Sequence, residues 1–217
     1  AGIICGGARD GERVTINPLV SCGKCSACRA KRENICPDRQ IISIPPREGA
    51  FAQYVTIPER NLVTVPAECS LDKAALVEPL AVGWHTAKLA VHVIDINMEK
   101  RALVIGGGAI GLATALALKA MGIDDIVISE FNPLRREYLL EHIEAKVVEK
   151  TEASFSIVID AVGVASTRAV ASQLASPGGI IAHVGLGDNA DGLDIRRITL
   201  QEITFIGTYT YTAQDFK

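Results

Sequence analysis

The 217-residue sequence has few aromatic residues and no marked excess of charge. Phe, Trp and Tyr together make up 5% of the chain, and the formal net charge is −3. Such a chain has no strong field to gather nucleic acid or an anionic membrane, because long-range attraction of that kind needs an excess of positive charge. Small molecules, or further copies of the chain, are the partners that remain.

Long hydrophobic runs are also missing. One long stretch without a charged residue extends from Ala102 to Leu118, which is marginal for a membrane span and contains four glycines. No charged leader is followed by an apolar segment and a small-residue cleavage site, so nothing marks export. We therefore expect a cytoplasmic protein, in which thiols stay reduced and clustered cysteines bind metal instead of pairing.

Hydrophobic residues make up 48% of the sequence, enough for one large core or two modest ones. Residues 1–80 contain segments rich in β-branched residues, at 11–17 and 50–57, which prolines interrupt; they predict short antiparallel strands. Residues 81–217 instead alternate apolar strands with helical patterns. We predict two domains with these ranges, joined by a helical stretch at 74–87.

Four of the six cysteines lie close together in the sequence, with the spacing C-x2-C-x2-C-x7-C: Cys22, Cys25, Cys28 and Cys36. The two-residue gaps let consecutive sulfurs converge on one ion, and four thiolates fill the tetrahedral shell of zinc. With no open coordination position, this zinc would fold a lobe at about residues 19–40 and take no part in catalysis.

Three alternatives exist for the cysteine cluster. An iron–sulfur cluster of the bacterial ferredoxin type has three residues before its last cysteine, where this chain has seven. A nucleic-acid-binding zinc module would interleave aromatic residues with the basic ones, and none is present. Disulfides are the third alternative. Cys5 and Cys69 stand alone in apolar segments, and we expect them to be buried small hydrophobes.

A glycine-rich turn follows the strand predicted at 101–105. Its pattern is Gly106-x-Gly108-x-x-Gly111, and a strong helix former over 109–121 comes next. In this context Gly106 allows the tight turn, Gly108 lets a pyrophosphate approach the backbone, and Gly111 lets the helix pack closely on the strand. The phosphates would bind the free N–H groups at the helix start, around Ala109 and Ile110.

An acid ends the next predicted strand, at 125–129. Glu130 lies about twenty residues beyond Gly111, where a dinucleotide site has a carboxylate for the adenosine ribose hydroxyls. This charge would repel a 2′-phosphate and so favours NAD over NADP, although Arg135 and Arg136 could offset the preference. The alternative interpretation of Glu130 is a solvated strand end.

Further strands are predicted at 156–160, 179–184 and 204–208, with a helix at 164–175. Strands that alternate with helices indicate parallel pairing with right-handed crossovers. The residues between Val148 and Phe155 are too few for a crossover helix, so that connection should be a loop. The predicted fold class is α/β, a Rossmann doubly wound parallel sheet preceded by part of a β domain with a zinc lobe.

The chain resembles the zinc-containing medium-chain alcohol and polyol dehydrogenases along essentially its whole length. The resemblance lies in the joint order of GERVTINPLVSCGKCSACRAKRENIC, GAFAQYV, LVEPLAVGWHTA, VIGGGAIG, VISEFNPLRRE and IDAVG. It implies a GroES-like β domain, a structural zinc on the four cysteines, and NAD on the glycine turn with Glu130 and Arg135 beside the ribose. It also implies dimers or tetramers and a backbone stretch lining the nicotinamide, at Val184, Gly185 and Leu186, and less surely at 207–209.

The catalytic zinc of the family is where this sequence departs from the pattern. The ligands there come from an N-terminal cysteine, a Gly-His-Glu motif, and an acid or cysteine at the position of Glu78. The sequence begins at AGIICGG, which resembles the residues immediately after Gly-His-Glu, and only Glu78 of that set is present. We therefore expect a fragment of a longer enzyme, in which Glu78 binds the zinc directly or through water; an acid that merely supports the site is the alternative.

For the complete enzyme, the resemblance implies hydride transfer from an alcohol carbon to NAD, with zinc acting on the substrate oxygen. Glu78 before Pro79 resembles the polyol and threonine branch, so a polyol or related secondary alcohol is the expected substrate. Alternatives are an NAD-binding protein without turnover and a zinc-independent reductase, against which the four-cysteine lobe argues. His85 is read as a packed residue or part of a proton relay, and the other three histidines as structural or surface residues.

Overall fold

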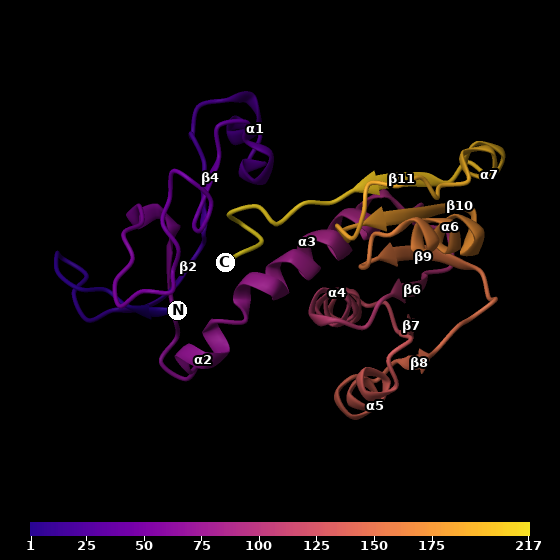
Figure 1. The fold of residues 1–217 in the computed structure, drawn as a ribbon, viewed down its shortest axis with the longest axis horizontal. Coiled ribbons are helices and arrows are strands. Elements are labelled where there is room, and N and C mark those ends of the chain that lie inside the picture. The colour runs from indigo at the N-terminus through magenta and orange to yellow at the C-terminus, as the bar shows by residue number, and fades with distance from the viewer. The chain divides into compact units, whose positions relative to one another are not determined.

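The computed structural model describes all 217 residues, which divide into two units (Figure 1). One unit comprises residues 1–81 together with 210–217, and the other comprises residues 82–209. The first border lies one residue from the predicted one. The second differs from the prediction, because residues 210–217 group with the first unit and not with residues 82–209.

Short strands form two small antiparallel sheets in the first unit. One sheet has the order β1-β2-β5, and the other pairs β3 with β4. The prediction of a strand within 11–17 is confirmed by β2. The strands are β1 (Gly2–Ile3), β2 (Arg13–Ile16), β3 (Leu19–Val20), β4 (Gln40–Ile41) and β5 (Leu62–Thr64). The helices are α1 (Ser26–Arg29), α2 (Leu71–Ala74) and 3-10 turns at Glu33–Ile35 and Glu59–Asn61.

Two predictions about the first unit were wrong. No strand forms at 50–57, where Phe51 and Tyr54 are exposed and the segment pairs with no other strand. A β-branched segment becomes a strand only beside a partner that completes its ladder. Cys5 is exposed and Cys69 is half-buried, so neither is a core residue, although both have apolar neighbours in sequence.

A helix continues from the first unit into the second. The stretch predicted at 74–87 is divided into α2, which ends at Ala74, and α3 (Val77–Val93). Glu78 lies in the first turn of α3, and the later turns, from Val82, belong to the second unit.

The second unit contains one parallel sheet of six strands, in the order β11-β10-β9-β6-β7-β8. Its strands are β6 (Arg101–Ile105), β7 (Asp125–Ser129), β8 (Lys146–Val148), β9 (Phe155–Asp160), β10 (Ala175–His183) and β11 (Thr204–Gly207). The strand order reverses between β6 and β9, so the carboxyl ends of these two strands flank the crevice where ligands of such sheets bind.

Helices cover both faces of this sheet. Alternate residues of β6 point to opposite faces: Ala102 and Val104 pack with α3, α4 (Ala109–Ala120) and α5 (Pro133–His142), whereas Leu103 and Ile105 pack with α6 (Ala165–Leu174). Ile198 of α7 (Ile195–Leu200) packs on the second face. Strands buried on both faces are apolar throughout, which is why the sequence shows runs and not alternation. The predicted doubly wound Rossmann sheet is confirmed.

Two further features of this unit are the loop between β8 and β9 and a hydrogen bond near the ends of the unit. Residues 149–154 join β8 to β9 without a helix, as predicted, and Ala153 of this loop packs on the second face of the sheet. At the other end of the unit, the Thr86 and Thr208 hydroxyls lie 3.0 Å apart in a buried hydrogen bond. That bond joins α3 to the segment after β11.

None of the helices is both long enough and apolar enough to cross a membrane.

Candidate functional site

The four clustered cysteines converge in the first unit. The Sγ atoms of Cys22, Cys25, Cys28 and Cys36 all lie within 4.8 Å of one another. Cys25 Sγ is 3.5 Å from Cys28 Sγ, and Cys22 Sγ is 3.9 Å from Cys28 Sγ. A tetrahedral zinc with bonds of about 2.3 Å requires sulfurs about 3.8 Å apart, so the four thiols fit that ion. None of the six cysteines is in a disulfide.

Local backbone geometry prepares one thiol for ionisation. Hydrogen bonds from the backbone N–H groups of Lys24 and Cys25 lower the pKa of Cys22 to about 6. Burial raises the pKa of Cys36 to about 11. Because thiolates and not thiols bind zinc, a metal here would keep Cys36 deprotonated and release its proton.

The glycine turn links β6 to α4 in the second unit. Gly106 has φ +94°, a conformation that favours glycine, and a Cβ on Gly111 would collide with the carbonyl oxygen of Gly106. A Cβ on Gly108 would meet nothing within 4 Å. The turn therefore needs Gly106 and Gly111 for its own shape, whereas the space beside Gly108 is open to a ligand.

Glu130, directly after β7, forms a hydrogen bond with this turn. Its Oε2 accepts a hydrogen bond from Gly107 N at 2.8 Å, and its Oε1 accepts one from Asn132 N at 2.8 Å. Arg135 Nη1 lies 3.7 Å from Oε2. Glu130 is only 7% exposed, so the alternative of a solvated strand end was wrong. Arg136 instead donates to the carbonyls of Glu130 and Phe131.

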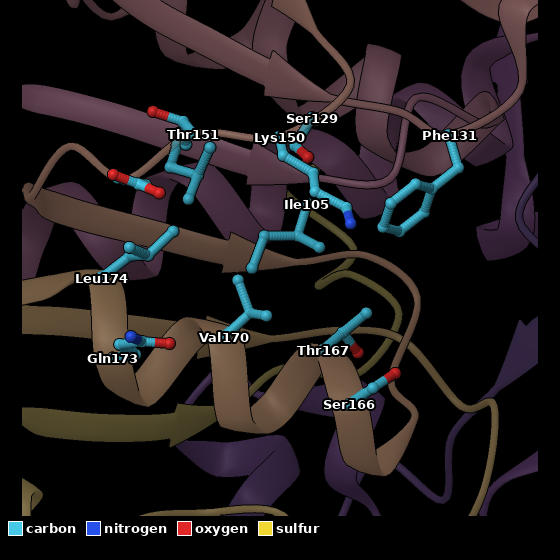
Figure 2. A pocket seen from close by; sticks show the side chains of 12 residues that line it. Ile105, Ser129, Phe131, Lys150, Thr151, Ser166, Thr167, Val170, Gln173 and Leu174 are labelled. Atoms are coloured by element: carbon cyan, nitrogen blue, oxygen red, sulfur yellow. The ribbon is translucent and has the colours of Figure 1, made fainter.

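A cavity of about 520 Å³ lies at the end of β7, where Ser129 and Phe131 line it together with the loop after β8. Figure 2 shows apolar side chains of β6 and α6 at its floor, with Lys150 and Phe131 on one side. Lys150 Nζ lies 5.8 Å from the centre of the Phe131 ring. Sequence reasoning missed both residues, although an aromatic residue directly after Glu130 was an available signal.

The stretch predicted to line the nicotinamide follows β10. The backbone N–H groups of Val184 and Gly185 both donate to the Asp160 carbonyl at 3.0 Å, and Leu186 is 86% exposed. The Asp160 carboxylate is fully buried and accepts from the backbone N–H groups of Val162 and Gly163. The ends of β9 and β10 are thus tied together at the same edge of the sheet as the glycine turn.

Glu78 is half-buried in the first turn of α3. Its Oε1 accepts a hydrogen bond from Tyr211 Oη at 3.0 Å. Tyr211 is buried in the same unit, and sequence reasoning did not predict this contact. The four cysteines are the only group of three or more Cys, His, Asp or Glu residues arranged to hold an ion. The structure therefore does not bring other metal ligands to Glu78.

The histidines are dispersed. His85 is buried on α3, whereas His92 and His142 are exposed. His183 Nε2 lies 3.6 Å from Asp160 Oδ2, and the ring packs against Phe205. No histidine joins the cysteine cluster.

Comparison with known proteins agrees with this geometry. A family model described as zinc-binding dehydrogenase matches residues 109–217, and one described as alcohol dehydrogenase GroES-like domain matches residues 3–67. Sorbitol dehydrogenase of Bacillus subtilis is 31% identical over 93% of this chain and 60% of its own length. The chain thus spans about 60% of the length of that relative.

Solved structures of dehydrogenases are also similar to this chain. L-idonate 5-dehydrogenase of Escherichia coli superposes with a TM-score of 0.86 and 25% identity, over 95% of this chain and 62% of its own. A zinc-binding dehydrogenase of Sinorhizobium meliloti, solved with NADP, gives a TM-score of 0.83 and 26% identity, over 95% of this chain and 65% of its own. The GroES-like match before a Rossmann unit fits the architecture described above, and the chain belongs to the zinc-binding dehydrogenase family.

Proposed function

We propose that this chain acts in a zinc-dependent oxidoreductase that transfers a hydride between the CH–OH carbon of an alcohol and NAD. The observation that carries the proposal is the pairing of Glu130 with the glycine turn beside an open cavity. That arrangement would supply a carboxylate and free helix N–H groups, with an apolar recess next to them. These are the contacts that a ribose, a pyrophosphate and an adenine need.

The chain's own residues would orient the dinucleotide along the edge of the sheet. The adenine would enter the cavity beside Phe131, and the Glu130 carboxylate would accept from the ribose hydroxyls with its remaining lone pairs. The pyrophosphate would lie over Gly108, Ala109 and Ile110. The nicotinamide would lie against Val184, Gly185 and Leu186, where a flat backbone can present one ring face to the substrate carbon.

NAD is the proposed cofactor in preference to NADP. The buried Glu130 carboxylate opposes a 2′-phosphate, and Arg135 is the cation nearest to it, with a side chain that is largely exposed. Because the Sinorhizobium relative was solved with NADP, both dinucleotides belong in the test.

The four cysteines would hold a structural zinc, with no position left for substrate. For the catalytic zinc, Glu78 is the residue of this chain that we propose as a ligand or as an acceptor for its water. A catalytic zinc supplies Lewis acidity, which lowers the pKa of a bound hydroxyl toward neutrality. Tyr211 would fix the carboxylate of Glu78 through its hydrogen bond.

The proposed substrate is a polyol or another secondary alcohol. The Glu78-Pro79 pair and the similarity to a sorbitol dehydrogenase support this class. We further propose a cytoplasmic homodimer or homotetramer, with no nucleic-acid or membrane partner. The free edge of β11, which pairs only with β10, would offer a surface for strand pairing between copies.

Titration of the chain with NADH and NADPH, followed by nicotinamide fluorescence, tests the cofactor proposal. NADH is expected to bind more tightly than NADPH. The Glu130→Ala variant is expected to lose NADH binding, whereas the Glu137→Ala control should bind NADH as wild type does. Reduction of NAD by sorbitol and butanediol, followed by absorbance, then tests the reaction. Absence of binding for both dinucleotides would contradict the proposal.

The alternative function is dinucleotide binding without turnover. Among the residues of this chain, Glu78 has no second metal ligand beside it. Metal analysis separates the two: a second zinc per chain supports the dehydrogenase, whereas one zinc with NADH binding and no NAD reduction supports the binding protein.

A further inference from the structure

One arginine of the second unit is buried without belonging to a core ion-pair network. Arg168, in the second turn of α6, is 7% exposed. Charged side chains are rarely buried unless their donors are satisfied. What satisfies this one is mostly backbone, from two loops at the carboxyl edge of the sheet.

The Arg168 guanidinium joins those two loops. Its Nη1 donates to the carbonyl of Gly163 at 2.9 Å, in the turn after β9. Its Nη2 donates to the carbonyl of Ala190 at 2.5 Å and to that of Asp191 at 3.2 Å, in the loop after β10. The same Nη2 also pairs with the Asp188 carboxylate. The loop after β10 is thereby fastened to α6.

Asp188 completes the fastening from the loop side. Its Oδ2 accepts from Ala165 N at 3.2 Å in the first turn of α6, and its Oδ1 accepts from Ala190 N at 3.0 Å. Its backbone N–H donates to the Gly163 carbonyl at 3.0 Å. A Cβ on either Gly163 or Gly185 would collide with the backbone of the other, so the two loops lie directly on one another.

We propose that Arg168 and Asp188 are positioning residues that fix the backbone of Val184, Gly185 and Leu186 for the nicotinamide. This inference rests on the proposed dinucleotide site. Residues 184–194 contain no helix or strand, so the ion pair and its carbonyl contacts hold the loop in one conformation. Without the guanidinium, the carbonyls of Ala190 and Asp191 lose these donors and the loop can move.

The effect should be confined to one half of the cofactor. None of the hydrogen bonds of Arg168 reaches β6, β7, the glycine turn or Glu130. The adenosine half would bind those elements, and only the nicotinamide half would meet the loop. A general loss of stability would weaken both halves alike.

The test compares two ligands on the full chain. Binding of NADH and of 5′-AMP, which represents the adenosine half alone, is measured by calorimetry for wild type, Arg168→Met, Arg168→Lys and Asp188→Asn. The matched control is Arg197→Met, because Arg197 also donates to two backbone carbonyls, those of Ser172 and Ala175, away from the loop.

The expected result is a split between the ligands. Arg168→Met and Asp188→Asn raise the Kd for NADH about tenfold or more, with the Kd for 5′-AMP within about twofold of wild type. Arg168→Lys recovers part of the NADH affinity, and Arg197→Met changes neither constant. If Arg168→Met does not fold, the NADH and 5′-AMP dissociation constants of Asp188→Asn alone test the inference.

Three outcomes would overturn the inference: equal weakening of both ligands, unchanged NADH binding, or the same split in Arg197→Met. They differ from failure of the proposed function, in which the wild-type chain binds neither NADH nor 5′-AMP. That failure would remove the inference as well.

Discussion

Gly108 and Gly111 of the turn between β6 and α4 differ in the space that surrounds them. Gly111 lies against the Gly106 carbonyl, whereas the space beside Gly108 is open. We expect Gly111→Ala to lower the free energy of unfolding by about 1–3 kcal/mol, because backbone must move to admit the methyl group. Urea denaturation measures this.

Gly108→Ala serves as the counterpart. It should unfold at the wild-type urea concentration, yet raise the Kd for NADH about tenfold, since the methyl group would occupy the space proposed for the pyrophosphate. Equal stability loss in the two variants would contradict this assignment of the open space.

Asp188 should make stability depend on pH at the acid end. The hydrogen bond from Arg168 holds the pKa of Asp188 below its ordinary value of 3.8. Because the folded-state pKa lies below the unfolded one, the ionised carboxylate stabilises the fold fully above about pH 4. This contribution is lost as the pH falls through the folded-state pKa.

Asp188→Asn should therefore have a lower Tm than wild type at neutral pH and a shallower fall of Tm between about pH 5 and pH 3. Circular dichroism at several pH values measures both. Asp124→Asn is the control, because that exposed side chain makes no hydrogen bond or ion pair. Parallel curves for wild type and Asp188→Asn would disprove the effect.

At the scale of elements, α5 depends on its first residues. The Asn132 side chain accepts from the backbone N–H groups of Leu134 and Arg135 at 2.9 and 3.2 Å, and Pro133 opens the helix. Asn132→Ala should cost about 1 kcal/mol of stability, whereas Asn132→Asp should be nearly neutral. Denaturant titration of the three proteins checks this, and an equal loss in both variants would exclude capping as the cause.

The cysteine lobe should require its metal. A chelator, or Cys36→Ser, should reduce zinc from about one per chain to near zero and expose the remaining cluster thiols to a thiol reagent. Cys5→Ser is the control, because Cys5 lies outside the cluster and is exposed. Slow reaction of the cluster thiols after chelation would mean that the lobe folds without zinc.

The elements that sequence predicted best are those with locally encoded signals. The apolar runs of β6, β7 and β9 and the glycine turn are recognisable because both faces of the sheet are buried and the turn sterically needs glycine. Segment 50–57 carries the same kind of β-branched signal but lacks a partner strand. A strand is a property of a pair, which one segment cannot reveal.

Parts of the candidate site that lie close together in the sequence were predicted, whereas contacts between distant segments were not. The cysteines lie close in sequence, so their spacing alone indicated convergence. Glu130 was proposed from its distance to the glycine turn, whereas its hydrogen bond from Gly107 N was not predicted. The contacts of Arg168 with residues 188–191, and of Tyr211 with Glu78, join segments far apart in the chain. No local pattern encodes them.

At the scale of the whole molecule, the two units should respond to different ligands. The cysteine cluster that fits zinc lies in the first unit, and the proposed dinucleotide site lies in the second. Calorimetric unfolding should therefore show a transition that a chelator lowers and another that NADH raises by several degrees, since a ligand at 100 times its Kd adds about 2.7 kcal/mol. A single transition that both reagents shift equally would contradict independent units.

The hydrogen bond between Thr86 and Thr208 has a consequence for engineering. It holds the two ends of residues 82–209 close together. In the chain, this unit is an insertion between residues 1–81 and 210–217, which form the first unit. Proteins tolerate insertion and permutation where chain ends meet in this way. Residues 82–209, with the proposed dinucleotide site, could thus be excised whole, closed on themselves with a short linker, and transplanted into a loop of another protein.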